Sequence, residues 1–433
     1  MFRFACILGV LLLATAARAQ KPKLDAAARA SAIEGVLRCL NESYVFPDVA
    51  KKMEAAIRER AAHKEYDAIE DGSALAEQLT QDLRAVSHDL HLHVSYSPGV
   101  LPPEEPMGQP PLAEMRRTLA RDNFGFGRIE ILKGNIGYIQ CLYFAPPEIA
   151  GDTYSAAMNY VANTDALILD LRACNGSMSE DALPMLCGYF FERPVHLNDF
   201  YWRSADSIRQ TWTWAHVPGT RYLNKPIYVL TSGKTFSGAE ELAYGLKNLK
   251  RATLVGDRTG GGANGGGDRR ASDHFSVWVP NGRAINPITR TNWEGVGVAP
   301  DIEVSAIRAL ETAHRRLVQQ LMADTGDAEW KERLKGVLAE LEQSAPPLVK
   351  VAFTLQGYPD ARTVTVAGAF NYWAMRANPL VRKGDAWVGE VEMEPGRHPY
   401  KFVVDGKWIV DPANPLTEKD GEFTNSVRVV RRE

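Results

Sequence analysis

The chain has 433 residues, enough for two or three domains with full-sized hydrophobic cores. Its formal net charge of −3 provides no basic excess, so we expect neither nucleic acid nor an anionic membrane surface as a partner. Five cysteines without a C-x-x-C pair are too few for a scaffold built on disulfides.

Residues 1–19 have the pattern of a secretory signal peptide, with a basic start, a short apolar run and an Ala-x-Ala site ending at Ala19. A buried N-terminal helix fits less well, because Arg18 would interrupt it. The apolar run is too short to span a bilayer and no later stretch is long enough, so we expect no membrane anchor. Loss of Arg3 and Arg18 changes the net charge from −3 to −5. We predict an exported protein, periplasmic or secreted.

Four cysteines stay in the mature chain. We expect most of them to be buried free thiols, although an oxidising compartment leaves one or two disulfides open. They are Cys39, Cys141, Cys174 and Cys187.

The apolar pattern changes along the chain from helical to mixed and then to β. Residues 24–86 show helical spacing, and a Pro-rich link at 98–111 is too short for a domain. Short apolar runs then alternate with amphipathic helices, which predicts an α/β core with a largely parallel sheet. The runs are 136–144, 166–171, 226–230 and 252–255, and the helices are 153–161, 179–191 and 238–246. Charged helices at 306–341 precede alternating segments at 349–431, which predict an independent β-sandwich.

Ser237 lies where a predicted strand ends and a helix begins, at the carboxyl edge of the sheet where open α/β folds bind ligands. Ser237 and Glu240 also form a capping box, which needs no chemistry. A nucleophile would gain from the same geometry, because a helix N-terminus and the amide of Gly238 stabilise negative charge. The pattern alone leaves both roles open.

Histidines cluster at residues 87–94, a predicted turn into a strand in which His91 and His93 would share one face. His88 falls outside that pattern. A His-x-His pair can bind metal, but no companion His/Glu cluster accompanies it, so we assign no metal ligands.

Four segments in this order resemble the tricorn-core and C-terminal-processing group of serine peptidases, and most of all its branch with interphotoreceptor retinoid-binding protein modules. The segments are Asp89-Leu-His91-Leu, Asp170-Leu-Arg-Ala-Cys-Asn-Gly176, Thr235-Phe-Ser237-Gly-Ala-Glu240 and Trp293-Glu294-Gly-Val-Gly-Val-Ala-Pro-Asp301. The resemblance covers roughly residues 30–310 and implies an α/β fold: a helical N-terminal cap and a crossed α/β core.

The same resemblance implies a serine-type peptidase that acts on a peptide or protein substrate without a cofactor. By position, Ser237 matches the nucleophile, His91 the general base and Glu294 the acidic member. The amides of Gly238 and Gly176 match the oxyanion donors. These roles are chemically consistent with acyl transfer.

Two positions depart from the family. Leu90 stands where tricorn-type sites carry a serine that links the histidine to the glutamate, which leaves the connection between Glu294 and His91 open. Gly262 occupies the position of the lysine in the Ser/Lys branch, and the link at 98–111 leaves no room for that branch's PDZ domain. A Ser/His pair is therefore favoured.

Two further segments carry weaker signals. The glycine run 260–267 lacks the lysine and the spacing of a phosphate loop, so we interpret it as a loop beside the site. The aromatic-rich segment 200–214 predicts a hairpin that either lines a cleft or packs in the core.

The last module resembles the glycogen-binding domain of the AMP-activated kinase beta subunit, an early-set β-sandwich. The resemblance rests on segments at 364–373, 398–408, 411–415 and 424–425. It implies stacking of glucose rings on two tryptophans and hydrogen bonds from a lysine and an asparagine, which makes an α-glucan a candidate partner. The matching residues are Trp373, Trp408, Lys401 and Asn425, whereas Trp387 is expected in the core. A purely structural role for the module stays open.

The predicted organisation has six parts: signal peptide 1–19, helical cap 20–97, Pro-rich link 98–115, peptidase core 116–305, helical segment 306–343 and β-sandwich 344–433. The main alternative to a peptidase is a non-catalytic ligand- or glycan-binding protein on the same scaffold.

Overall fold

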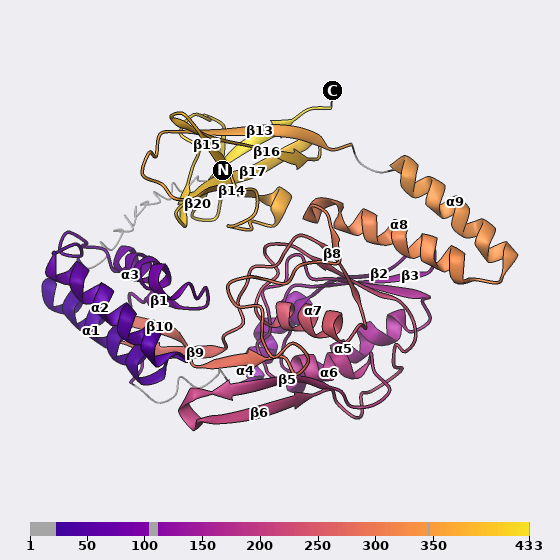
Figure 1. The fold of residues 1–433 in the computed structure, drawn as a ribbon, viewed down its shortest axis with the longest axis horizontal. Coiled ribbons are helices and arrows are strands. Elements are labelled where there is room, and N and C mark those ends of the chain that lie inside the picture. The colour runs from indigo at the N-terminus through magenta and orange to yellow at the C-terminus, as the bar shows by residue number, and fades with distance from the viewer. Residues whose placement is uncertain (1–22, 104–110, 345–346, 433) are drawn as a thin grey trace, which may run out of the picture.

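The computed structural model describes residues 23–103, 111–344 and 347–432. The chain forms a helical cap, an α/β core beside it and a β-sandwich over both (Figure 1). None of the described helices is long and apolar enough to cross a membrane. The predicted signal peptide lies outside the described residues and stays a prediction, which N-terminal sequencing of the exported protein would test.

The cap is a three-helix unit with a small sheet behind it. Asp25 and Asp71 cap the first and third helices by accepting the amides of Ala28 and Ala74 at 2.7 and 2.9 Å. One face of each helix is apolar and buried, as the spacing predicted. The elements are α1 (Ala26–Ser43), α2 (Pro47–Ala62), α3 (Gly72–Ser87) and β1 (His93–Tyr96).

The cap also takes two strands from a part of the sequence that was assigned to the core. β9 (Gly266–Arg270) and β10 (Phe275–Pro280) join β1 in one antiparallel sheet, and Phe275, Val277 and Val279 pack among the cap helices. The predicted limits of 20–97 and 116–305 miss this exchange, because alternating apolar residues show that a strand is half buried but not which helices cover it.

The core is a six-stranded sheet in the order β12-β8-β7-β4-β3-β2, parallel except for the β2–β3 pair. Every residue of β4 and β7 is buried, which explains their continuous apolar sequences. The strands are β2 (Phe126–Leu132), β3 (Ile136–Cys141), β4 (Ala166–Asp170), β7 (Ile227–Thr231), β8 (Thr253–Gly256) and β12 (Ile302–Glu303).

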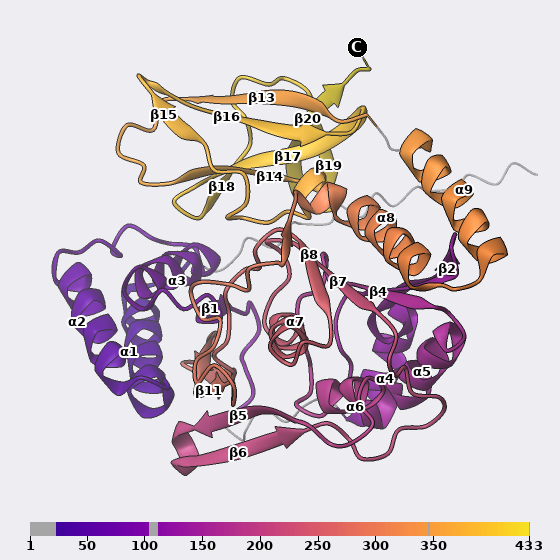
Figure 2. The same ribbon diagram turned by 45° about the vertical axis from the view of Figure 1, so that its right-hand side comes forward.

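Helices cover both faces of this sheet (Figure 2). One face packs against the pair α8 and α9, and the other against the helices between the strands. They are α4 (Leu112–Leu119), η1 (Ala120–Gly125), α5 (Pro147–Val161), α6 (Ala182–Gly188), α7 (Gly238–Asn248), α8 (Ala306–Asp324) and α9 (Ala328–Ser344). Cys141, Cys174 and Cys187 are buried free thiols, as expected for most of the cysteines, and Cys39 is buried as well.

The predicted aromatic hairpin is present. β5 (His196–Trp202) and β6 (Ser207–Trp212), joined by η2 (Arg203–Ala205), pair antiparallel, and β11 (Gly282–Ile285) pairs with β5. Trp212 is 47% exposed and stacks on the His196 ring, so part of the hairpin faces solvent instead of the core.

The C-terminal module is an antiparallel sandwich with a core of its own, which includes Trp387 as expected. Asp405 and Gly406 form the turn between β17 and β18. Its elements are β13 (Val349–Gln356), β14 (Val364–Gly368), η3 (Ala369–Asn371), β15 (Val381–Lys383), β16 (Ala386–Met393), β17 (Gly396–Val404), β18 (Lys407–Ile409), β19 (Thr417–Asp420) and β20 (Phe423–Val430). The predicted fold class is confirmed.

Helix α1 packs closely against Ala271, directly after β9, and this contact can be tested by its effect on stability. A Cβ at Gly35 would lie 1.9 Å from the carbonyl oxygen of Ala271, so we expect Gly35→Ala to destabilise the protein by about 1–3 kcal/mol. Gly336, an exposed glycine in α9 with nothing near its Cβ position, is the matched control, and Gly336→Ala should stabilise by up to about 1 kcal/mol. Thermal unfolding measures both, and equal effects of the two changes would contradict the packing argument.

Candidate active site

Ser237 lies in the turn between β7 and α7, with φ 53° and ψ −124°. A non-glycine residue in this region costs about 1–3 kcal/mol and persists only where its surroundings fix it. A strained serine between a parallel strand and a helix is typical of a nucleophile that must be exposed at a sheet edge. The backbone therefore favours chemistry at Ser237 over capping alone.

Glu240 fixes this turn. Its buried carboxylate accepts hydrogen bonds from the amide of Ser237 at 3.0 Å, the hydroxyl of Thr259 at 2.5 Å and the amides of Gly261 and Gly262 at 2.7 and 2.8 Å. The capping interaction from Glu240 to Ser237 is thus real, but it is one of four. Burial raises the pKa of Glu240 to about 7, while the four donors act in the opposite direction.

Gly176 and Gly238 lie together beside Ser237. A Cβ on Gly176 would meet the Cβ of Ser237 at 2.8 Å and the amide nitrogen of Gly238 at 3.0 Å. Gly176 has φ 124°, which a larger residue would adopt only under strain. The amide of Gly238 belongs to the first turn of α7, which has no acceptor within the helix. The geometry suits a shared oxyanion pocket.

His91 lies in the turn before β1, closed by a hydrogen bond from its amide to Asp89 at 3.0 Å. The expectation that His91 and His93 share a strand face is wrong, because β1 begins only at His93. The His91 ring packs on Phe236, the residue before Ser237, with 4.6 Å between ring centroids. Burial lowers the pKa of His91 to about 4, so the imidazole is neutral near pH 7 and able to accept a proton.

Gly262 leaves no room for a side chain beside this pair. A Cβ there would lie 2.3 Å from the Phe236 ring and 2.7 Å from Cε1 of His91. A lysine at this position, as in the Ser/Lys branch, would displace the imidazole.

Glu294 and Asp89 bring two carboxylates to His91. One ligand atom from each of the three side chains lies within 4.8 Å of the other two. Oε2 of Glu294 accepts the amides of Ala263 and Asn264 at 2.5 and 3.0 Å, and the Asn264 side chain donates to Asp89 at 2.9 Å.

The two atoms through which Glu294 and His91 could form a hydrogen bond are not yet paired. Oε1 of Glu294 and Nδ1 of His91 are both buried, and neither has a hydrogen-bond partner among the described residues. Glu294 thus comes close to His91 without the serine that Leu90 replaces. A small movement of the imidazole would pair the two groups, as catalytic hydrogen bonds often tighten only on substrate binding.

The three side chains of Asp89, His91 and Glu294 could also hold a divalent cation, since two carboxylates and an imidazole suit one. In the sequence Asp89 is part of the Asp89-Leu-His91-Leu motif and was given no role. The spacing of two residues between Asp89 and His91 does not show that the carboxylate turns towards the imidazole.

The four candidate sugar-binding residues lie on neighbouring elements of the sandwich. The rings of Trp373 and Trp408 are 6.0 Å apart at 57°, and Trp408 is 39% exposed. The ammonium of Lys401 lies over the ring of Phe423, which is 69% exposed and was not singled out from the sequence. Asn425 lies on β20, next to the strand that carries Lys401, and is 5% exposed.

Family models match three parts of the chain. Residues 135–304 match Peptidase family S41, and residues 23–125 match the N-terminal domain of Peptidase_S41 in eukaryotic IRBP. Residues 349–433 match the glycogen recognition site of AMP-activated protein kinase. The chain carries a family S41 peptidase domain. It also carries a carbohydrate-binding module of the AMP-activated kinase type, so both predicted resemblances are confirmed.

Individual proteins are similar over shorter stretches or at low identity. The human 5'-AMP-activated protein kinase subunit beta-2 is 27% identical over 111 residues, which are 25% of this chain and 38% of that protein. The pig subunit beta-1 is 36% identical over 69 residues, 16% of this chain and 55% of its relative. The S41 chain thus spans well under two thirds of these curated relatives.

Solved structures with similar folds include a lipoprotein from Streptococcus agalactiae, at 16% identity and TM-score 0.44, covering 67% of this chain and 96% of that one. A photosystem II D1 C-terminal processing protease aligns at 14% identity and TM-score 0.40, covering 64% and 93%.

The environment of Glu294 predicts a pH-dependent stability. Burial and the charge of Asp89 raise the pKa of Glu294 to about 8, above its unfolded value near 4.3. The folded state thus holds a proton that the unfolded chain loses, and stability should fall as pH rises from about 4.3 to 8. Glu294→Gln should remove up to about 1.4 kcal/mol of this loss per pH unit. Denaturant unfolding at pH 5 and 8 checks it: a difference between wild type and variant that does not change with pH would contradict the assignment.

Proposed function

We propose that this S41 protein is a serine peptidase that hydrolyses peptide bonds through an acyl-enzyme on Ser237. The observation that carries the proposal is the strained Ser237 beside the paired glycines at 176 and 238, with a neutral, half-buried His91 packed against the adjacent Phe236. This arrangement supplies a nucleophile, oxyanion donors and a base in one place.

In the proposed reaction, Oγ of Ser237 attacks the scissile carbonyl carbon while His91 accepts the hydroxyl proton. The amides of Gly176 and Gly238 donate to the tetrahedral oxyanion. Collapse breaks the C–N bond, and His91 returns the proton to the leaving amine. Water then attacks the acyl-enzyme with His91 again as base, which releases the carboxylic acid and restores Ser237. Glu294 orients the imidazole by accepting a hydrogen bond from it.

Labelling by a fluorophosphonate probe tests this proposal. Wild type should be labelled, whereas Ser237→Ala should not react and His91→Ala should react at least about a hundredfold more slowly, since a general base contributes about 10²–10⁴-fold. His88→Ala, which changes a histidine on the same loop, should label normally. A chelator should leave labelling unchanged, because no step uses a metal.

Failure to label folded wild type would reject the peptidase and favour the non-catalytic ligand binder on the same scaffold. Loss of labelling with a chelator, restored by a divalent cation, would assign Asp89, His91 and Glu294 to a metal instead.

We also propose that the C-terminal module binds an α-glucan. Two partly exposed indoles with rings 6.0 Å apart provide stacking surfaces for sugars, and Lys401 lies on β17, the strand that pairs with the strand of Trp408. This surface is a candidate tether to glycan.

Affinity electrophoresis in glycogen checks the glucan site. Wild type should be retarded, and the double change Trp373→Ala with Trp408→Ala should abolish the retardation. Tyr358→Ala, which removes an aromatic residue 37% exposed on the same module, is the matched control and should migrate as wild type. Equal loss in the control, or retardation that survives the double change, would reject the site.

A further inference from the structure

The C-terminal module is fixed on the peptidase core through one of its loops, at 369–378. The ring of Tyr372 packs under the guanidinium of Arg172, 5.3 Å away, and Arg172 is itself paired with Asp170 at 2.6 Å. At Gly233 a Cβ would lie 3.1 Å from the methyl group of Ala374. A second contact, the ion pair of Arg308 with Glu392 at 2.9 Å, holds the sandwich from the other side.

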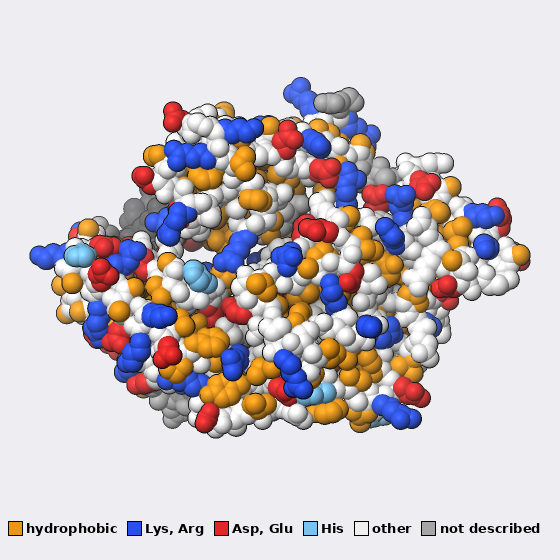
Figure 3. Space-filling model, in the orientation of Figure 1, with side chains coloured by type: hydrophobic (Ala, Val, Ile, Leu, Met, Phe, Trp, Pro, Cys, Tyr) orange, Lys and Arg blue, Asp and Glu red, His pale blue; other side chains and the backbone are white. Residues whose placement is uncertain are grey.

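This docking forms a cleft of about 460 Å³ between the two modules. Figure 3 shows the hollow beneath the sandwich, with Lys, Arg and His side chains at its rim. Gly295 and Val296 line the cleft and directly follow Glu294, so it opens beside the candidate active site.

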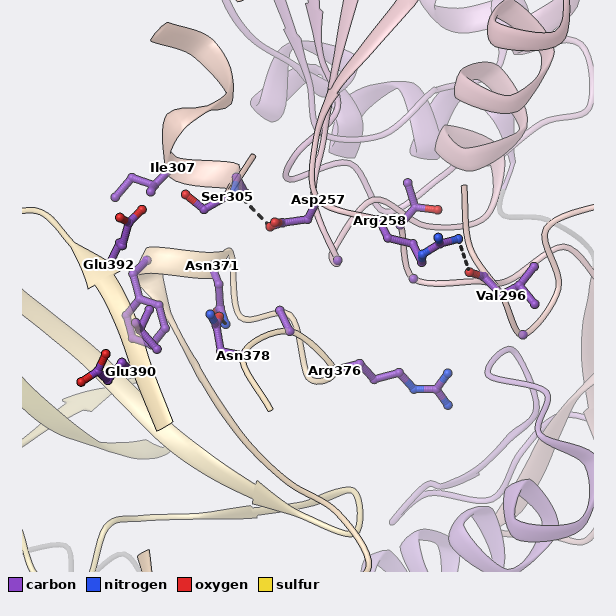
Figure 4. Close-up of a pocket in the computed structure, with 18 residues that line it drawn as sticks. Asp257, Arg258, Val296, Ser305, Ile307, Asn371, Arg376, Asn378, Glu390 and Glu392 are labelled. Carbon is purple, nitrogen blue, oxygen red and sulfur yellow. Dashed lines mark hydrogen bonds between the residues drawn. The ribbon is translucent and has the colours of Figure 1, made fainter. Parts of the chain in front are cut away.

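The charges along the cleft are separated (Figure 4). Glu390, Glu392 and Asp257 lie towards one end, whereas Arg258 of the core and Arg376 of the sandwich lie towards the other. A carboxylate would be repelled at the first end and attracted at the second.

The side chain of Arg376 takes no part in holding the fold together. No hydrogen bond or ion pair joins its side chain to any part of the chain that the structure describes, and it is exposed in the cleft. Within the described ranges, Arg258 donates a side-chain hydrogen bond only to the carbonyl of Val296, at 3.3 Å.

The nearby charges leave Arg376 available. Glu294 lies near enough to act on Arg376 by its charge, but no ion pair joins the two among the described residues. Arg84 adds a further positive charge, although its own guanidinium is held by the carbonyls of Leu90 and Leu92 at 2.7 Å. Two guanidiniums from different modules face a cleft in which an incoming anion would be stabilised.

We propose that Arg376 and Arg258 bind a carboxylate of the peptide substrate, so that the carbohydrate-binding module contributes to peptidase specificity. The substrate class is a peptide with an acidic side chain or a free C-terminus next to the cleaved segment. The inference rests on the proposed peptidase function for its biological meaning, but the binding can be measured without catalysis.

The test uses the full mature chain carrying Ser237→Ala and fluorescein-labelled random decapeptide pools. The pools either keep Asp and Glu or replace them by Asn and Gln, and each has a free or an amidated C-terminus. Fluorescence anisotropy should show tighter binding of at least one carboxylate-bearing pool by about tenfold, the effect of a charge-assisted hydrogen bond. The free and amidated arms separate a C-terminal carboxylate from an acidic side chain.

Arg376→Gln and Arg258→Gln should each remove most of this preference, and Arg376→Lys should keep part of it because the charge remains. Arg431→Gln, the same change at an exposed arginine of the same module, is the control and should bind as the parent. Raising the salt concentration should weaken the preference.

Equal binding of all four pools, or equal loss in Arg376→Gln and Arg431→Gln, would overturn the proposal. A carboxylate preference that depends on Arg376 in a protein whose Ser237 does not react with the fluorophosphonate would keep this inference and reject the peptidase. A reactive Ser237 without the preference would do the reverse.

Discussion

The carboxylate of Glu240 joins the two segments that must meet for the candidate site to exist. It is fully buried, and it accepts from the turn that carries Ser237 and from the loop of Thr259, Gly261 and Gly262. Burying a carboxylate is costly unless donors compensate it, and an ionised carboxylate offers acceptors only, so four donors match its capacity. Three of them are backbone amides, which makes the position of the glycine loop depend on Glu240.

The loop held by Glu240 then orders the acidic side of the site. Directly after Gly262, the amides of Ala263 and Asn264 bind Glu294, and the Asn264 side chain binds Asp89. Asp89 in turn accepts the amide of His91. The chain of hydrogen bonds therefore runs from the helix that follows Ser237 through the glycine loop to His91, and it crosses from the core into the cap. Strands β9 and β10, which belong to the cap sheet, connect the cap to the core at the same place.

Much of this arrangement could be predicted from the sequence, because local patterns and motif order carry it. The strand-to-helix junction at Ser237, the buried strands β4 and β7 and the separate sandwich all follow from short-range apolar spacing. The placement of Asp89 beside His91 could not, since it depends on a turn closed by side-chain hydrogen bonds. Nor could the transfer of β10 to the cap, because periodicity gives the buried face of a strand and not its partner.

The position of Arg376 was beyond sequence reasoning for a different reason: it depends on how two independently folding modules dock. Tyr372 and Trp373 have consecutive left-handed backbone conformations, with φ 57° and 59°. Tyr372 packs on Arg172 of the core, while Trp373 lies beside Trp408 in the proposed sugar-binding surface. Arg376 follows three residues later and enters the cleft. One short loop thus carries the anchor to the peptidase, one side of the proposed glucan site and the proposed carboxylate ligand. A glucan bound at Trp373 and a peptide bound at Arg376 would therefore order the same loop. If binding of one ligand stiffens this loop, the other ligand binds more tightly, because less conformational entropy is then lost.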